Sequence, residues 1–192
     1  MQKNNFQVYQ TPCQRPTVYK AILLGIVRRL LYLRVWIKQF GTSKDDIGYS
    51  PDSDDKGNIY IAGTTSGTFE NHENSGGFDA CLIKFNQNGD MIWVKQWGTK
   101  ADDELHTIVV NSDYIYVTTQ SYLALTKYST DGALQWDRKA DLDTTYRSYG
   151  ITIDAIGAIV VSGFTADKIY KISGTSLLNA FILKYSPEGE LQ

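Results

Sequence analysis

The chain is poor in the residues that cross-link small domains or bind metals. Its 192 residues include two cysteines, two histidines and four prolines. Cys13 and Cys81 provide neither a disulfide framework nor the paired spacing of a zinc site. Cys81 lies in an apolar run, so we expect a small core residue there. His72 and His106 form no Ser/His/Asp or Cys/His arrangement, and no glycine-rich phosphate loop is present. The sequence therefore assigns no residue to catalysis, to a cofactor or to a metal.

Acidic residues are absent from the first 38 positions, although the whole chain has a net charge of -2. The basic residues of this segment are Lys3, Arg15, Lys20, Arg28, Arg29, Arg34 and Lys38. The rest of the chain is therefore clearly acidic. Because phosphate contacts need lysine and arginine, this acidic region argues against nucleic acid as a partner.

Long hydrophobic runs are also absent. The apolar run at 21–27 is followed at once by Arg28 and Arg29, whereas a transmembrane helix needs about 20 apolar residues. No small-residue cleavage site follows it, so a signal peptide is not convincing. Helical spacing places Ile22, Ile26 and Leu30 on one face. We expect residues 1–35 to form a basic, helical extension. A helix on a membrane, a helix docked on the rest of the chain, and a start unrelated to the functional protein all remain open.

The most informative feature that the chain does contain is an internal repeat. The stretch Trp36-Ile-Lys-Gln-Phe-Gly-Thr returns as Trp93-Val-Lys-Gln-Trp-Gly-Thr, and a third copy begins at Trp136. Repeats of this length indicate a solenoid, propeller or array. We therefore expect a repeat region over residues 36–192, with units near 36–92, 93–135 and 136–192.

Each unit has the pattern of short antiparallel strands joined by tight turns. In the first unit the expected strands are 50–53, 58–63, 80–85 and 91–96; in the second they are 106–110, 114–118, 123–128 and 133–136; in the third they are 149–154, 158–163 and 179–185. Four such strands are one propeller blade. The fold class expected is therefore all-β, with about three blades, and each tryptophan is expected to pack between neighbouring blades.

The pattern Trp-x-Lys-Gln-Phe-Gly-Thr, then Gly-Asn-Ile-Tyr-Ile-Ala-Gly-Thr-Thr-Ser-Gly, then Gly-Gly-Phe-Asp-Ala resembles the bacterial β-propeller repeats called SBBP, of the seven-bladed type. The resemblance is close in the first unit and partial in the others. It implies an exported or surface-associated bacterial protein, and it implies no catalytic residues.

One departure concerns the first strand of the first unit. Where the family has apolar residues, this chain has Pro51-Asp-Ser-Asp. Proline removes a hydrogen-bond donor and aspartate disfavours burial. We therefore expect this strand to be weak or displaced.

Acidic residues recur at one place in two units. Asp45 and Asp46 follow Gly-Thr in the first unit, and Asp102 and Asp103 follow it in the second. Paired carboxylates can bind calcium, but in a turn they more often cap the backbone. The stretch 52–63 also suggests a calcium loop, yet lysine and glycine replace two of its ligands, which favours a plain hairpin.

The exposed loops 64–78 and 165–178 are the expected contact regions, because they are long, polar and carry Phe69, Phe78 and Tyr170. The function predicted is a non-catalytic scaffold for protein or glycan binding, extracellular or on the cell surface. A fragment of a propeller hydrolase or lyase and a degenerate, truncated reading frame are the alternatives. Because closed propellers have at least about four blades, we expect two open blade faces and either a longer ring or self-association.

Overall fold

The described part of the chain is built from strands alone. The computed structural model describes residues 36–119, 124–139, 146–165 and 178–192, and these contain no helix. This confirms the all-β prediction. The strands are β1 (Asp46–Ser53), β2 (Ile59–Thr65), β3 (Asp79–Phe85), β4 (Met91–Trp97), β5 (Leu105–Val110), β6 (Tyr114–Thr119), β7 (Ala124–Ser129), β8 (Leu134–Lys139), β9 (Tyr146–Ile153), β10 (Ile159–Thr165) and β11 (Asn179–Tyr185).

The chain divides into two units, Met1–Phe40 and Gly41–Gln192, and all eleven strands belong to the second. The helix expected over residues 1–35 lies outside the described residues. Among the residues that are described, none forms a helix long and apolar enough to cross a membrane.

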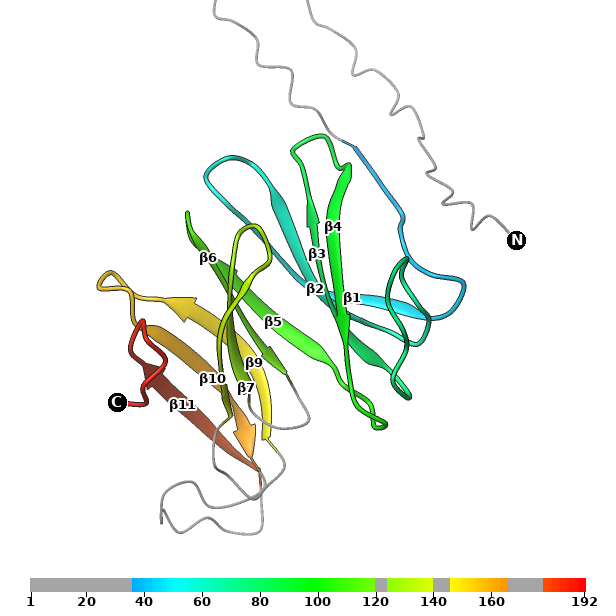
Figure 1. Ribbon diagram of the computed structural model, residues 1–192. Helices are drawn as coiled ribbons and strands as arrows, with labels where there is room; N and C mark the ends of the chain where they lie inside the picture. The colour runs from blue at the N-terminus through cyan, green and yellow to red at the C-terminus, as the bar shows by residue number, and fades with distance from the viewer. Residues whose placement is uncertain (1–35, 120–123, 140–145, 166–177) are drawn as a thin grey trace, which may run out of the picture. The chain divides into compact units, whose positions relative to one another are not determined.

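Three antiparallel sheets follow one another along the chain. Their strand orders are β1-β2-β3-β4, β5-β6-β7-β8 and β9-β10-β11, so strands adjacent in sequence are adjacent in space (Figure 1). In the third sheet Leu191 forms an isolated bridge with Tyr185, where Met91 pairs with Phe85 in the first sheet. The predicted four-stranded unit is confirmed for the first two repeats.

Tight turns connect these strands because glycine adopts the left-handed backbone that they require. Gly57 follows β1 with φ of 79°, and Gly89 follows β3 with φ of 75°. L-residues with a side chain rarely adopt this conformation. Both turns lie in the hairpins that the sequence predicted.

The expectation of a weak first strand is wrong. β1 has eight residues, and its register with β2 includes the pairs of Pro51 with Ile61 and of Asp52 with Tyr60. β1 is an edge strand of its sheet, where a missing N–H donor is tolerated. The Asp52 carboxylate is not buried without a partner, because it accepts a hydrogen bond from the backbone N–H of Val110 at 2.7 Å. The polar residues of β1 thus connect the first sheet to the second.

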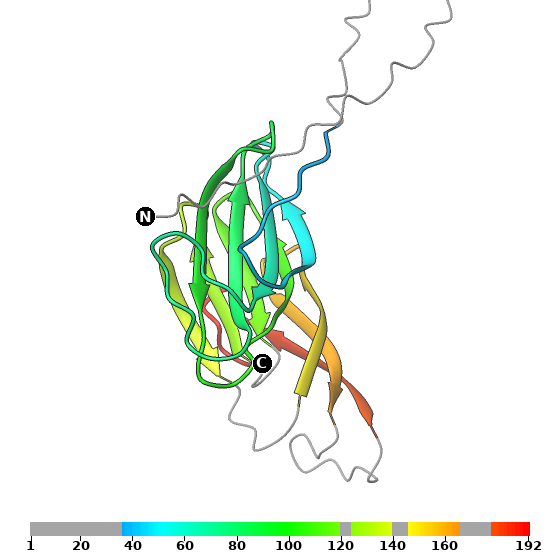
Figure 2. The ribbon, with the colours of Figure 1, turned by 90° about the vertical axis from the view of Figure 1, so that its right-hand side faces the viewer.

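The second sheet packs against both of the others (Figure 2). The core between the first and second sheets includes Tyr60, Leu82, Leu105, Ile115 and Val117. Each fully buried side chain of this size contributes about 1.5–3 kcal/mol relative to an exposed one. A second core joins the second and third sheets and includes Tyr116, Leu125, Ile159, Val161 and Leu183.

Two of the repeat tryptophans pack between sheets, as the sequence predicted, whereas Trp36 is 37% exposed. Trp93 lies partly buried against the first core, and Trp136 lies against the second. A Cβ added to Gly132 would lie 3.4 Å from Trp93, and one added to Gly189 would lie 3.1 Å from Trp136. The indole of one sheet therefore lies against the turn glycine of the next, and the contact is tight at Gly189.

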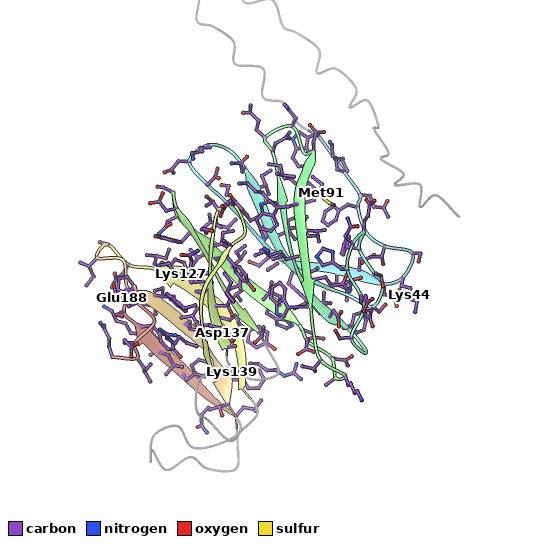
Figure 3. The ribbon with its side chains drawn as sticks, viewed as in Figure 1. Lys44, Met91, Lys127, Asp137, Lys139 and Glu188 are labelled. Atoms are coloured by element: carbon purple, nitrogen blue, oxygen red, sulfur yellow. The ribbon has the colours of Figure 1, made fainter. Side chains whose placement is uncertain are left out.

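A lysine on the third strand makes a second link of the same kind. Lys84 Nζ donates to the Thr130 carbonyl at 2.7 Å, and Lys127 Nζ donates to the Pro187 carbonyl at 3.3 Å. Lys127 is labelled in Figure 3. Lys127 also lies 3.8 Å from the ring centroid of Tyr114. The ring contact orients the lysine within its own sheet, and the bond to the carbonyl links that sheet to the next.

The two outer faces of the array differ. Leu82, Leu125 and Ile182 occupy equivalent register positions, but Ile182 is 73% exposed whereas the two leucines are fully buried between sheets. The face of the first sheet that carries Ile83 and Phe85 is buried. The expectation of two open faces is therefore wrong for the first sheet and agrees with the third.

Candidate functional site

A β-bulge interrupts the first strand of every sheet. The register with the second strand shifts between Gly48 and Ser50, between Leu105 and Thr107, and between Ser148 and Gly150. The extra residues at these shifts are Tyr49, His106 and Tyr149. Because a bulge re-aims the extra side chain, the same distortion turns one ring out of each sheet.

These rings form a row across the three sheets. The centroids of Tyr49 and His106 are 4.3 Å apart, and those of His106 and Tyr149 are 6.0 Å apart. Phe164 of β10 stacks on Tyr149 with a centroid separation of 5.7 Å. We call these four residues the aromatic row. Such separations are typical of attractive ring pairs.

The row is accessible at its surface. Tyr49 is 38% exposed and Tyr149 is 58% exposed, while Phe164 is half-buried and the side chain of His106 is 11% exposed. Exposed aromatic side chains arranged side by side leave apolar surface in contact with water. The arrangement can therefore accept a ligand that offers a flat, weakly polar face.

A carboxylate stands beside the row. Glu104 Oε2 lies 2.9 Å from Nε2 of His106, so the pair shares a hydrogen bond. Partial burial, and then the negative charge of Glu104, raise the pKa of Tyr49 above its ordinary value. The Tyr49 hydroxyl consequently remains protonated at neutral pH and can donate a hydrogen bond.

The sequence contained a signal for this row that motif analysis missed. Tyr49 follows Asp46 by three positions, and His106 follows Asp103 by three positions. The two rings thus occupy one repeat position, although one is a tyrosine and the other a histidine. Their equivalence becomes visible once the bulges are known.

The repeated aspartates serve as turn caps, which agrees with the interpretation that the sequence favoured. Asp46 accepts hydrogen bonds from the backbone N–H of Thr42 at 2.6 Å and from its hydroxyl. Asp103 accepts the same pair from Thr99, with the hydroxyl at 2.8 Å. The Asp102 carboxylate accepts the backbone N–H of Phe78 at 2.9 Å, and Asp45 is exposed. Each Gly-Thr turn thus closes on the aspartate four residues after its threonine.

The stretch that suggested a calcium loop is a capped hairpin. Asp54 is buried, and its carboxylate accepts hydrogen bonds from the backbone of Lys56 and Asn58 and from the hydroxyl of Tyr60. These donors lower the pKa of Asp54 despite the opposing effect of its burial. In the described residues no group of three or more His, Cys, Asp or Glu side chains is placed to hold a metal ion.

The loop at 64–78 is tied to its own sheet. Phe69 is buried, and its backbone N–H donates to the amide oxygen of Gln96. Gln96 in turn donates to the Gly67 carbonyl and to the buried Asp79. Phe69 is therefore a packing residue rather than a ligand contact, which corrects the expectation for this aromatic. Of the second loop, residues 166–177, with Tyr170, lie outside the described part of the chain.

The remaining candidates are placed apart from the row. His72 Nδ1 lies 2.9 Å from the Glu70 carbonyl in the first loop. Cys81 is buried in β3, which confirms it as a core residue, and its burial raises the pKa of the thiol to about 12. A thiol in this state is a poor nucleophile at neutral pH.

Comparison with known protein families identifies the first repeat. Residues 35–70 match the model of the SBBP family, a beta-propeller repeat, which confirms the resemblance for that segment. No curated protein sequence matches the chain. Among solved structures, an ACO/RPE65 chimera in a monoclinic crystal form is similar over 74% of this chain, with 8% identity and a TM-score of 0.46. The chain spans 37% of that structure's length.

Proposed function

We propose that the chain is a non-catalytic repeat scaffold that binds a protein or glycan ligand, as part of an exported or surface-associated bacterial protein. The observation that carries this proposal is the aromatic row, which sets rings from three successive sheets side by side, with those of Tyr49 and Tyr149 exposed. Binding residues concentrate where a rigid scaffold presents them. The three sheets supply such a scaffold, because cores and lysine links hold them together.

The proposal of a non-catalytic role is supported by the hydrogen bonds of the repeated aspartates. Acid–base catalysis by an aspartate or glutamate needs its carboxyl group within reach of a substrate proton. Asp46 and Asp103 instead accept hydrogen bonds from their own turns, and Asp79 is buried against Gln96. Export and surface location follow from the resemblance to SBBP repeats, whose model matches residues 35–70.

Titration calorimetry of the whole chain against soluble polysaccharides and extended peptides tests the proposal. The same mixtures are then incubated for long times and their products separated by chromatography. We expect heat of binding with ligand recovered intact. Turnover of a glycoside or lactone that disappears when Glu104 or His106 is replaced by alanine would contradict a non-catalytic role.

A further inference from the structure

We propose that the aromatic row is a binding site for a neutral oligosaccharide. This inference rests on the proposed binding function and specifies its ligand and its residues. The row contains three rings that come from bulges and a fourth, Phe164, that supports Tyr149 from behind by stacking at 5.7 Å. Because the four residues come from strands of three packed sheets, their spacing is set before a ligand arrives, and little ordering of the protein is required.

The chemistry of the row matches that of a sugar. A pyranose ring has a flat face of C–H groups and a rim of hydroxyl groups. The exposed ring of Tyr149 offers an apolar surface for such a face, while the Tyr49 hydroxyl and the His106 imidazole offer polar atoms at its edge. The Glu104 carboxylate, 2.9 Å from the imidazole, can accept hydrogen bonds from sugar hydroxyls. Sites for small ligands commonly combine aromatic lining with a few polar groups in this way.

Charge argues for a neutral ligand. Single-stranded nucleic acids also stack on aromatic rows, but their sites add a basic groove that follows the phosphates. Here the acid Glu104 is hydrogen-bonded to His106, the basic Arg147 lies opposite Phe164 in the register of β9 and β10, and the repeat region as a whole is acidic. A phosphate or uronate placed beside Glu104 would be repelled.

Backbone geometry argues against an added peptide strand. Peptides that extend a sheet need a regular ladder of backbone donors and acceptors on an edge strand. β1, β5 and β9 each carry a bulge at the residue that enters the row, and a bulge disrupts the ladder locally. The row therefore presents side chains rather than a continuous backbone edge.

Calorimetric titration of the whole chain with cellohexaose, maltohexaose, mannohexaose and xylohexaose tests this assignment. Oligogalacturonate and oligothymidylate serve as charged comparisons. We expect at least one neutral hexasaccharide to bind and the charged oligomers to bind more weakly. Tyr149→Ala should weaken binding by about tenfold, because the main stacking surface is lost, whereas Tyr149→Phe should retain it.

Ile156→Ala is the matched control, since Ile156 is a similarly exposed apolar residue in the turn after β9. It should bind like the original chain, and thermal unfolding should show that Tyr149→Ala remains folded. Failure of all four neutral hexasaccharides to bind, or tighter binding of a charged oligomer, would overturn the assignment. Saccharide binding that is unchanged in Tyr149→Ala would show that the aromatic row is not the binding site, while the proposed scaffold function would still stand. Saccharide cleavage that is lost in Tyr149→Ala would support the row and contradict the non-catalytic function.

Discussion

The Nζ atom of Lys84 lies 2.7 Å from the carbonyl oxygen of Thr130, and this contact joins the third strand of the first sheet to a turn of the second. Lys127 and Pro187 repeat the contact one sheet further on. In the third sheet Lys184 bonds to Asp154 of its own sheet at 2.8 Å. The lysine of each repeat thus links two sheets wherever a following sheet is described.

Loss of this link should weaken the chain. Lys84→Met keeps the aliphatic length but removes the donor to Thr130. We expect a loss of about 1–2 kcal/mol, because hydrogen bonds to charged groups are worth about 1.5–3 kcal/mol and Lys84 is only partly buried. Urea denaturation followed by circular dichroism measures the change. Lys100→Met, at an exposed loop position, is the control and should change stability by less than about 0.5 kcal/mol. Equal effects of the two substitutions would show that the contact contributes nothing.

Two glycines with the same backbone separate conformational strain from packing between sheets. Gly157 and Gly189 both have φ of 84°, so alanine is strained equally at either position. A Cβ at Gly157 would lie 3.5 Å from Pro187, whereas one at Gly189 would lie 3.1 Å from Trp136. We expect Gly189→Ala to destabilise the chain by about 1 kcal/mol more than Gly157→Ala, because overpacking adds to the strain. Thermal unfolding of both variants tests this, and equal melting temperatures would contradict the indole contact.

The turn aspartates should contribute unequally to the stability of the chain. Asp103 is buried and closes its turn on Thr99, while Asp45 is exposed. Asp103→Ala should cost about 1–3 kcal/mol, because it removes the charged acceptor of two hydrogen bonds from Thr99. Asp45→Ala should stay within about 0.5 kcal/mol of the original chain. Chemical denaturation of the two variants checks the difference, and a neutral Asp103→Ala would show that the cap is dispensable.

Stability should fall in alkaline solution. Burial raises the pKa of Cys81 from 9.0 to about 12 and that of Tyr128 from 10.0 to about 12. A raised folded-state pKa means that the folded chain retains a proton that the unfolded chain releases, so stability is complete below about pH 8 and decreases between about pH 9 and 12. Urea unfolding at intervals of pH measures this decrease. Cys81→Ala should make the decrease shallower, and an unchanged slope would show that the thiol is not linked to unfolding.

Much of the fold could be predicted because its determinants are local. Alternation of apolar residues specifies strands, and glycine or asparagine in short connections specifies hairpins. The expected strands therefore agree with β1 to β11, and the tryptophans at 93 and 136 lie between sheets as predicted. The prediction of a weak first strand was wrong because the sequence does not show the neighbouring sheet, where the backbone N–H of Val110 donates a hydrogen bond to Asp52.

The candidate site could not be predicted in the same way. Phe69 belongs to a polar loop in the sequence, yet Gln96 holds that loop on its sheet and Phe69 is buried. Conversely, Tyr49, His106 and Tyr149 belong to strands whose alternation gives no reason to expect adjacent rings. Burial and exposure of these aromatics depend on contacts that are distant along the chain.

The amino-acid sequence alone determined the repeat, its strands, its turns and the packing role of its tryptophans, because each depends on residues close together along the chain. Only the tertiary structure decided which rings meet. A bulge adds one residue to each first strand, and the packing of three sheets then brings the extra residues to centroid distances of 4.3 and 6.0 Å. Such distances arise from register shifts and contacts between sheets, which no local sequence pattern encodes.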